Sequence, residues 1–267
     1  MLKKLLLTGA AGGVGQNIRP LLSQLAEKVV LSDLGDVFDL GPKETFVRCN
    51  LADAQGVLRL LEGVDGVIHL GGVSVERSFD IILQGNIIGL YNLYEAARHQ
   101  GKPRIVFASS NHVVGYYRQD EKIDNTVYPR PDSLYGVSKV FGEAVASMYY
   151  DKFGQETLSL RIGSCFDRPL NPRMLASWLS YRDFVSLCER AFLAPKLAHT
   201  IVYGASANQP TWWDNSNADF LGWQPQDSSE KWRAEVEAAT GEQDPNDPMV
   251  IYQGGAFAGS GHPDDNL

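Results

Sequence analysis

The sequence is poor in several features that mark whole classes of protein. Only three of its 267 residues are cysteines. Cys49, Cys165 and Cys188 are an odd number and lack the spacing of metal ligands, so neither a disulfide scaffold nor a zinc site is expected. The five histidines do not group as metal ligands either. We therefore expect no bound metal, and free thiols in a reducing cytoplasm.

Long hydrophobic runs and runs of basic residues are also missing. No stretch approaches the roughly 20 apolar residues that a membrane-spanning helix needs. The short leucine run near the N-terminus ends at Thr8 without a signal-peptide cleavage site. The formal net charge is −8, from 24 basic and 32 acidic residues, which argues against nucleic acid or an anionic membrane surface as a partner.

Short apolar runs alternate with segments of helical spacing along most of the chain. Seven of these runs are typical of buried strands: 4–9, 28–33, 45–50, 66–72, 104–110, 157–163 and 200–206. Strands that alternate with helices predict βαβ units and a mostly parallel sheet covered on both faces. The fold class is therefore α/β.

Two segments depart from this regular pattern. The helix predicted from Val14 to Leu25 contains Pro20, and because an interior proline costs about 3 kcal/mol we expect a kink there. Residues 241–267 are rich in Gly, Pro and Asp, which predicts an irregular tail, disordered at its extreme end.

A glycine-rich turn follows the first predicted strand. Gly9, Gly12 and Gly15 stand between a strand and a helix in "LLLTGAAGGVGQNI". Glycines at such a turn let the backbone approach a pyrophosphate at the helix N-terminus; the alternative is a turn that binds nothing. Asp33 ends the second strand at roughly the distance expected for the acid that binds an adenosine ribose. Its carboxylate repels a 2′-phosphate and "LGDVFD" after it has no basic residue, so NAD is favoured over NADP.

A tyrosine and a lysine stand four residues apart in "DSLYGVSKVFGE". On a helix this spacing places Tyr135 and Lys139 on one face. A tyrosine acts as an acid or base when its pKa, about 10 unperturbed, is lowered, and we expect the Lys139 ammonium to lower it. The alternative is a chance pair on an exposed helix face. A run of four polar side chains, 109–112, also ends the fifth strand, where it resembles a polar wall facing a ligand.

Together these motifs resemble an extended short-chain dehydrogenase/reductase. "TGAAGGVG", "HLGG", "GNIIGLYNLYEAA", "VFASS", "YGVSK" and "LGWQP" stand in the expected order. The resemblance implies a Rossmann-like doubly wound parallel sheet in one domain, 1–267, with an NAD-binding core at about 1–163 and a small substrate-binding extension at about 164–267. It implies that Ser110 polarises the reacting oxygen, that Tyr135 is the base, and that Lys139 binds the nicotinamide ribose.

The resemblance also implies the residues around the cofactor. They are Gly9, Gly12, Gly13, Val14, Gly15, Asp33, Asn50, Leu51, Leu70, Gly71, Gly72, Lys139 and Cys165. Asn50 departs from the family, which usually has Asp there. Cys165 is expected to pack near the nicotinamide rather than to act as a nucleophile. Asn86 resembles the structural asparagine of the family, whose members commonly associate as homo-oligomers through the helices that contain Asn86 and Tyr135.

Longer stretches, such as 69–117, "NPRMLASWLS" and "WWDNS", closely resemble the bacterial uronate dehydrogenases within this family. That resemblance implies NAD-dependent oxidation of the cyclic hemiacetal of D-galacturonate or D-glucuronate at C1 to an aldarolactone. Only about 100 residues follow Arg161, too few for a domain that grips a nucleotide sugar, so a small sugar acid is the expected partner.

The sugar acid needs hydrogen-bonding groups and a cation. The expected contacts are Ser74, Ser110, Asn111, His112, Ser164, Arg173 and Phe257. Arg173 is the candidate for the C6 carboxylate, because a guanidinium binds carboxylate with two parallel hydrogen bonds; Arg168 is the alternative. Phe257 closes the pocket of its own subunit, reaches a neighbour's, or is only a packed tail residue. The alternatives for two other contacts are that His112 pairs with loop backbone and that Arg173 is a solvated surface arginine.

Two other functions remain open from the sequence. A sugar epimerase or dehydratase of the extended family keeps its NAD bound and returns the hydride. A non-catalytic NAD-sensing module binds NAD and turns nothing over. Fold alone does not separate these, because this architecture hosts many functions.

Overall fold

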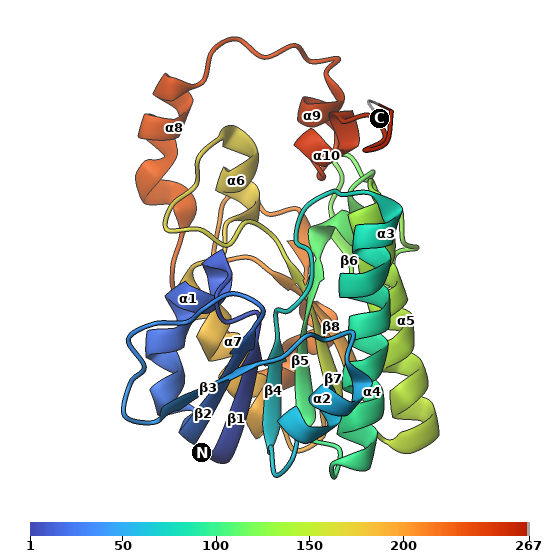
Figure 1. The fold of residues 1–267 in the computed structure, drawn as a ribbon. Helices are drawn as coiled ribbons and strands as arrows, with labels where there is room; N and C mark the ends of the chain where they lie inside the picture. The colour runs from blue at the N-terminus through green and yellow to red at the C-terminus, as the bar shows by residue number, and fades with distance from the viewer. Residues whose placement is uncertain (266–267) are drawn as a thin grey trace.

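Seven parallel strands form the centre of the molecule, in the order β3-β2-β1-β4-β5-β7-β8 (Figure 1). The computed structural model describes residues 1–265. The strands are β1 (Leu2–Thr8), β2 (Ala26–Asp33), β3 (Glu44–Arg48), β4 (Gly66–His69), β5 (Arg104–Ser110), β7 (Thr157–Ile162) and β8 (His199–Gly204). All seven predicted strands are therefore present, and the predicted Rossmann-like doubly wound parallel sheet is confirmed.

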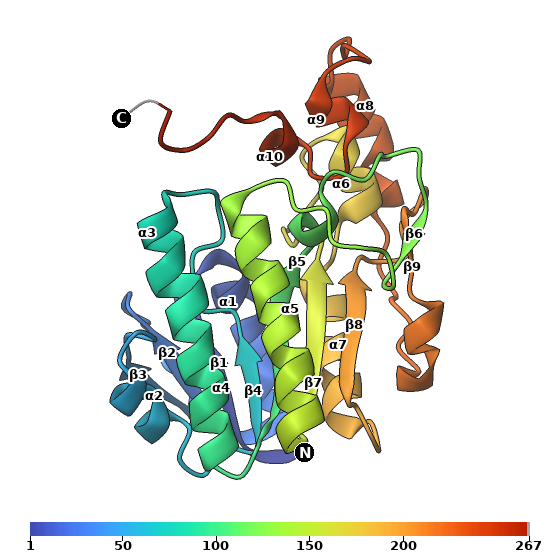
Figure 2. The same ribbon diagram turned by 90° about the vertical axis from the view of Figure 1, so that its right-hand side faces the viewer.

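Helices cover both faces of the sheet, as Figures 1 and 2 show. One face carries α1 (Gly13–Ile18), the 3₁₀ helix η1 (Arg19–Gln24) and α7 (Tyr181–Leu193). The other carries α2 (Ala54–Leu60), α4 (Gly89–His99) and α5 (Leu134–Phe153). Successive strand residues point to opposite faces: Leu5 and Leu7 pack in the core on the α7 side, and Leu6 packs in the core on the α4 side.

The first helix ends before Pro20 instead of kinking around it. The α-helical segment stops at Ile18, and a 3₁₀ helix with Pro20 near its start follows. Proline lacks the N–H that the α-helical ladder needs, and its ring clashes with the carbonyl four residues earlier. The prediction of one kinked helix was wrong for this reason.

Most of the remaining elements lie beyond the carboxyl ends of the strands or along the edge at β8 (Figure 2), whereas residues 83–88 continue directly into α4 beside α5. The remaining elements are α3 (Phe79–Ile82), the π-helical η2 (Leu83–Ile88), η3 (Asn111–Val114), α6 (Pro172–Ser177), η4 (Ser216–Leu221), η5 (Ser229–Trp232), α8 (Arg233–Ala239), α9 (Pro248–Ile251) and α10 (Ala256–Gly259). A second, two-stranded parallel sheet joins β6 (Ile123–Asp124) to β9 (Trp213–Asp214).

The segment predicted as an irregular tail packs into the fold. It forms α9 and α10, and Gln253 and Gly254 between them are buried. The predicted disorder of the extreme end concerns residues 266–267, which lie outside the described residues. Residues 241–247 and 260–265 are irregular, as predicted, whereas α9, α10 and the buried residues between them are not a loose tail. Gly-rich composition reports backbone freedom and not the long-range contacts that remove it.

Three further observations concern what the fold contains. Cys49, Cys165 and Cys188 are buried free thiols. From residue 1 to residue 265, no helix combines the length and the apolarity needed to cross a membrane. Within the same residues, no group of three or more His, Cys, Asp or Glu side chains is arranged to hold a metal ion.

Candidate active site

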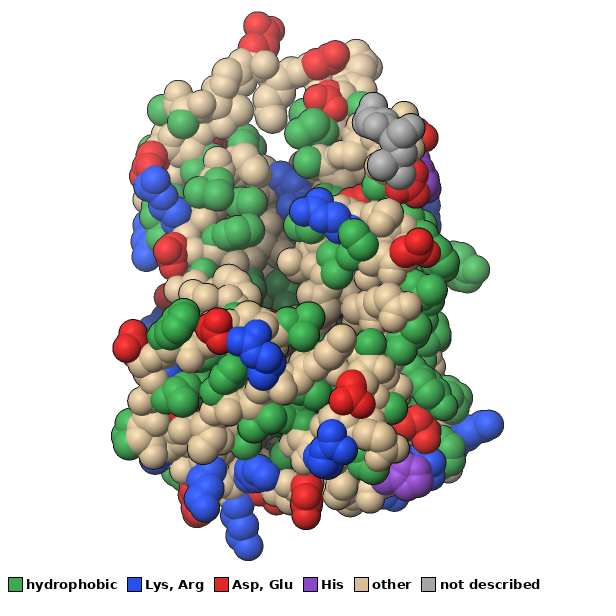
Figure 3. All heavy atoms as spheres, viewed as in Figure 1, with side chains coloured by type: hydrophobic (Ala, Val, Ile, Leu, Met, Phe, Trp, Pro, Cys, Tyr) green, Lys and Arg blue, Asp and Glu red, His purple; other side chains and the backbone are tan. Residues whose placement is uncertain are grey.

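A cleft of about 1250 Å³ opens at the carboxyl ends of the strands. Figure 3 shows the face of the molecule hollowed between the side that carries α6 and α8 and the side that carries α9 and α10. Chain order reverses next to β1, which pairs with β2 on one side and β4 on the other, and ligands of open α/β sheets bind at such switch points. The cleft brings together every residue predicted for the site: Gly9, Gly12, Gly13, Val14, Gly15, Asp33, Asn50, Leu51, Leu70, Gly71, Gly72, Ser74, Ser110, Asn111, His112, Tyr135, Lys139, Ser164, Cys165, Arg173 and Phe257.

The glycine turn is built so that only glycine fits at two positions. Gly9 has φ +74°, and a Cβ there would lie 2.6 Å from the carbonyl carbon of Leu70. A Cβ on Gly15 would lie 2.2 Å from the Gly9 oxygen. A Cβ on Gly13 would meet nothing within 4 Å, so the start of α1 faces open space. This cradle fits the pyrophosphate of a dinucleotide.

Asp33 fastens the glycine turn to the end of β2. One carboxylate oxygen accepts a hydrogen bond from Ala11 N and the other accepts one from Gly35 N, each at 2.9 Å. Each oxygen keeps a second lone pair for a ribose hydroxyl. Arg48, at the end of the neighbouring strand β3, reaches this loop and pairs with Asp36. "LGDVFD" itself gives no sign of this cation, because Arg48 comes from another strand.

The helix that carries Tyr135 and Lys139 is held at its N-terminus by two residues. Ser133 accepts a hydrogen bond from Gly136 N at 2.9 Å. The Glu76 carboxylate accepts from Leu134 N at 2.9 Å and from Tyr135 N at 2.8 Å. These bonds satisfy backbone donors that a helix start leaves unpaired. Sequence reasoning missed Glu76, which lies in the loop before α3 and carries no local motif.

Tyr135 and Lys139 lie together as their spacing predicts, with Nζ of Lys139 5.4 Å from the Tyr135 ring centroid. Burial raises the pKa of Tyr135 to about 12, and a hydrogen bond with Ser110 acts in the opposite direction. Burial also lowers the pKa of Lys139 from 10.5 to about 8. The expected lowering of the Tyr135 pKa by Lys139 is therefore absent from this arrangement, because desolvation of the phenolate dominates.

Asn86 connects this helix to the loop that carries Ser74. Its amide oxygen accepts from Val73 N at 2.7 Å. Its amide nitrogen donates to Val73 O at 3.0 Å and to Ser138 Oγ at 2.9 Å. Asn86 thus holds the two walls of the cleft at a set distance, in agreement with the structural role that the family resemblance implies.

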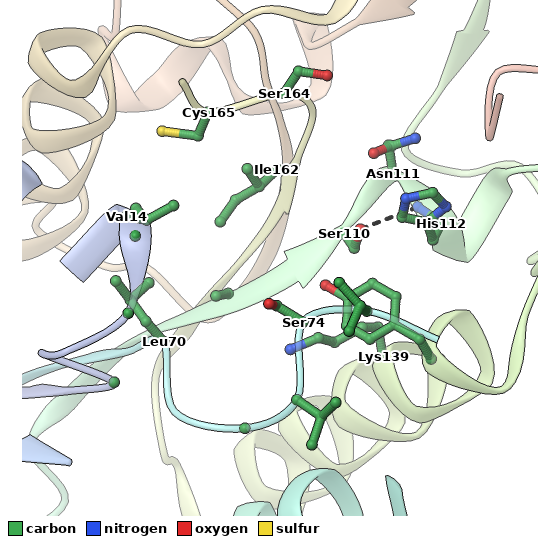
Figure 4. Close-up of a pocket in the computed structure, with 18 of the residues that line it drawn as sticks. Val14, Leu70, Ser74, Ser110, Asn111, His112, Lys139, Ile162, Ser164 and Cys165 are labelled. Atoms are coloured by element: carbon green, nitrogen blue, oxygen red, sulfur yellow. Dashed lines mark hydrogen bonds between the residues drawn. The ribbon is translucent and has the colours of Figure 1, made fainter. Parts of the chain in front are cut away.

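Ser110, Asn111 and His112 at the end of β5 line the cleft, where Figure 4 shows Ser110 and His112 near Lys139 and Ser74. The Ser109 hydroxyl instead donates to Glu143 Oε1 at 2.6 Å, so the predicted polar wall holds for three of its four side chains. Ser110 Oγ accepts from His112 N at 3.2 Å. Nδ1 of His112 lies 2.8 Å from Oδ2 of Asp132, whose side chain is fully buried. The Phe257 ring lies over the His112 ring with 3.9 Å between centroids, so Phe257 reaches the cleft of its own chain.

Arg173 projects its guanidinium into the cleft and makes three hydrogen bonds to the protein. Nε donates to Gln253 O at 2.6 Å and Nη1 donates to Ser164 Oγ at 3.3 Å. With the Asn111 amide oriented by its hydrogen-bond partners, Nη2 donates to the Asn111 oxygen at 2.7 Å. Burial lowers the pKa of Arg173 to about 10, against the opposing charge of Asp132.

The two arginines considered for the substrate differ sharply in their surroundings. Among residues 1–265, Arg173 has no carboxylate within 4.0 Å of its guanidinium nitrogens. Arg168 pairs with Glu235 at 2.7 Å, with the two side chains 54 % and 63 % exposed, and it lies outside the cleft. The arginine that remains available to an anion in the cleft is therefore Arg173.

The remaining predicted residues have simpler environments. Ser74 is exposed to the cleft, whereas Ser164 is buried and bonds to Ser177 Oγ at 2.9 Å. Burial raises the pKa of the Cys165 thiol, which disfavours the thiolate that a nucleophilic cysteine needs.

Comparison with known proteins agrees with this geometry. The NAD dependent epimerase/dehydratase family matches residues 5–172. The uronate dehydrogenase of Agrobacterium fabrum is 56 % identical over 96 % of this chain and 97 % of its own. The crystal structure of a glucuronic acid dehydrogenase from Chromohalobacter salexigens superposes with a TM-score of 0.98 at 63 % identity, covering 99 % of this chain and 100 % of that one.

A third likeness concerns the cofactor. A mutant uronate dehydrogenase from Agrobacterium tumefaciens, solved in complex with NAD, superposes with a TM-score of 0.95 at 55 % identity, covering 97 % of this chain and 98 % of that one. These findings confirm the predicted family resemblance and the prediction of NAD as the cofactor.

Proposed function

The chain belongs to the NAD dependent epimerase/dehydratase family and is an NAD-dependent oxidoreductase, and on that premise we propose that it oxidises D-galacturonate and D-glucuronate at C1 to their aldarolactones. The observation that carries this proposal is Arg173, a cation that faces the cleft without a carboxylate partner among residues 1–265. It lies within the same cleft as the polar wall and Tyr135. The relatives that are named for uronate or glucuronic acid support the same substrate class.

The carboxylate of the sugar acid binds to the terminal nitrogens of Arg173. A guanidinium has five N–H groups, and three of them already point at Gln253, Ser164 and Asn111. One N–H on each terminal nitrogen remains, which is the arrangement that two parallel hydrogen bonds to a carboxylate require. Asn111 therefore orients Arg173.

His112 offers its second ring nitrogen to a sugar hydroxyl. Its Nδ1 is committed to the buried carboxylate of Asp132 at 2.8 Å, so Nε2 is the nitrogen left for the substrate. The Phe257 ring, which packs on His112, covers the apolar side of this contact and keeps water from it. Ser74 adds a hydroxyl on the opposite wall.

Oxidation removes a proton from the C1 hydroxyl and a hydride from C1. Tyr135 takes the proton, and Ser110, close enough to act on the Tyr135 pKa by hydrogen bonding, polarises the same oxygen. When bound, NAD would supply the hydride acceptor and the positive charge of its oxidised nicotinamide ring. Together with that charge, the Lys139 ammonium favours the phenolate that burial otherwise disfavours.

The product follows from the substrate's own chemistry. C1 of a cyclic hemiacetal already carries the ring oxygen, so loss of hydride and proton makes an ester within the ring, a lactone. No covalent enzyme intermediate is needed, consistent with a buried Cys165 whose pKa is raised.

The test is the absorbance of NADH at 340 nm, with purified protein, NAD and each of D-galacturonate, D-glucuronate and galactose. NADP replaces NAD in a parallel series. We expect net NADH with both uronates and little with galactose, which has no carboxylate. Tightly held NAD with no net NADH would instead indicate an epimerase or dehydratase, and NAD binding without turnover of any sugar acid would indicate a sensing module.

A further inference from the structure

The C-terminal segment, residues 241–259, forms part of the wall around Arg173. We propose that Gln253 is a positioning residue of the substrate site, which holds this segment and the Arg173 guanidinium in place. The inference rests on the proposed function, since it concerns how the uronate site is assembled. Gln253 itself does not line the cleft, whereas the next four residues, 254–257, do.

The Gln253 side chain is 0 % exposed and ties the segment to two other parts of the chain. Its amide oxygen accepts from Trp213 Nε1 at 2.8 Å. Its amide nitrogen donates to Arg118 O at 2.9 Å and to Glu121 O at 3.0 Å. Both amide hydrogens are used. Moving the Gln253 side chain would break these bonds and leave buried polar groups without partners, which costs free energy.

The Gln253 main chain continues this connection into the cleft. Its N–H donates to Tyr117 O at 2.8 Å, and its carbonyl accepts from Arg173 Nε at 2.6 Å. The side-chain bonds therefore fix the position of a carbonyl that orients the cation. If Gln253 is displaced, its carbonyl, which accepts from Arg173 Nε, moves as well, and the guanidinium changes its orientation.

The residues after Gln253 pack directly on the site. Gly255 has φ +60°, and a Cβ there would lie 2.5 Å from Arg173 Cδ, so the backbone lies against the arginine stem. A Cβ on Gly254 would lie 1.8 Å from Oδ2 of Asp132, the carboxylate that holds His112. Phe257 follows and covers the His112 ring. One buried glutamine thus positions three groups of the sugar site.

The hydrogen bonds of Gln253 do not reach the glycine cradle, Asp33 or Lys139. Tyr135 lies closer to the segment, with its ring centroid 6.0 Å from that of Phe257. The family match covers residues 5–172, which include the glycine cradle, Asp33, Tyr135 and Lys139. Arg173 and Gln253 follow it. Loss of the Gln253 side chain should therefore weaken the sugar site selectively, and a misplacement of about 1 Å at such a site costs on the order of 100-fold.

The experiment compares Gln253→Met with Gln155→Met. Methionine matches glutamine in length but cannot make the three bonds. Gln155 is also 0 % exposed and donates to Pro103 O at 2.7 Å, but it precedes β7, at the end of the sheet opposite the cleft. We expect Gln253→Met to raise KM for uronate about 10-fold to 100-fold, with KM for NAD within about twofold of wild type. Gln155→Met should leave both KM values near wild type.

Two outcomes would overturn the inference: an unchanged KM for uronate in folded Gln253→Met, or parallel rises in the KM values for uronate and NAD. Should Gln253→Met fail to fold, Trp213→Phe removes the indole bond together with part of the ring that stacks on Tyr203, and it should raise KM for uronate selectively by a smaller factor. Hydrogen exchange is independent of substrate: Gln253→Met should speed exchange in residues 241–259 and leave residues 9–15 unchanged. If the wild-type protein makes no NADH from uronates, the proposed function is wrong, whereas the hydrogen-exchange result still tests the role of Gln253.

Discussion

Replacing Arg173 by methionine tests the carboxylate site most directly. Methionine keeps an unbranched stem and removes the charge and all five N–H groups. Three acceptors lose their donor: Gln253 O at 2.6 Å, the Asn111 oxygen at 2.7 Å and Ser164 Oγ at 3.3 Å. The substrate carboxylate loses its two hydrogen bonds as well.

The expected loss follows from these contacts. Truncating one partner of a buried, hydrogen-bonded charge pair costs about 2–5 kcal/mol. At about 1.4 kcal/mol for each factor of ten, kcat/KM for uronate should fall about 30-fold to 5000-fold. We expect the upper part of this range, because the protein acceptors are left unpaired in addition to the substrate. Galactose has no carboxylate, so its residual turnover should change far less.

The assay is NADH formation at 340 nm over a range of uronate and NAD concentrations. Arg168→Met is the matched control, since that arginine pairs with Glu235 on the surface outside the cleft. It should leave kcat/KM for uronate within about twofold, as exposed ion pairs contribute little. An unchanged KM for uronate in folded Arg173→Met would refute the assignment of the carboxylate site.

Three further substitutions separate the other parts of the site. Tyr135→Phe should lower kcat about 100-fold to 10,000-fold while NAD binding, followed by fluorescence titration, stays intact; retained turnover would exclude Tyr135 as the base. Lys139→Met should abolish most activity yet stabilise the fold. Folding lowers the pKa of Lys139 from 10.5 to about 8. Between these pH values the unfolded wild-type chain binds one more proton than the folded one, so the free energy of unfolding of the wild type rises with pH. In denaturant titrations the free energy of unfolding of Lys139→Met should exceed that of wild type by about 3 kcal/mol below pH 8, and the difference should vanish above pH 10.5. Equal free energies of unfolding at pH 7 would contradict the burial argument. Asp33→Ser should raise KM for NAD about 10-fold or more and raise the NADP-to-NAD activity ratio, and an unchanged ratio would show that Asp33 does not select the cofactor.

Many residues on the cofactor side of the cleft were predictable from the sequence, because short sequence patterns mark them. The strands carry runs of apolar residues, since both faces of a parallel sheet are buried. Gly9 and Gly15 mark a turn whose backbone allows no side chain. Tyr135 and Lys139 share a helix face through their spacing alone. Each of these patterns spans a few residues and reports burial or backbone conformation directly.

The side chains on the substrate side of the cleft are positioned by contacts between segments that are distant in the sequence, so they were harder to predict. Glu76 caps the helix of Tyr135, Asp132 holds His112, and Gln253 orients Arg173. Glu76 and Gln253 belong to no local motif, and Asp132, although it stands three residues before Tyr135, carries no sequence signal for its contact with His112. A Gly-rich composition also made the segment around Gln253 resemble a loose tail. The Tyr135 pKa was misjudged for the same reason, because desolvation depends on everything packed around the phenol.

The sequence by itself therefore determined the sheet, the glycine cradle, the acid at the end of β2 and the tyrosine–lysine pair. Periodicity and short spacings encode these features, because a few adjacent residues signal each strand, turn or helix face. Only the tertiary structure decided which arginine is free to meet a carboxylate and which buried side chains hold it. Those properties arise when segments as far apart as α6 and the C-terminal residues pack together, and no short stretch of sequence records that packing.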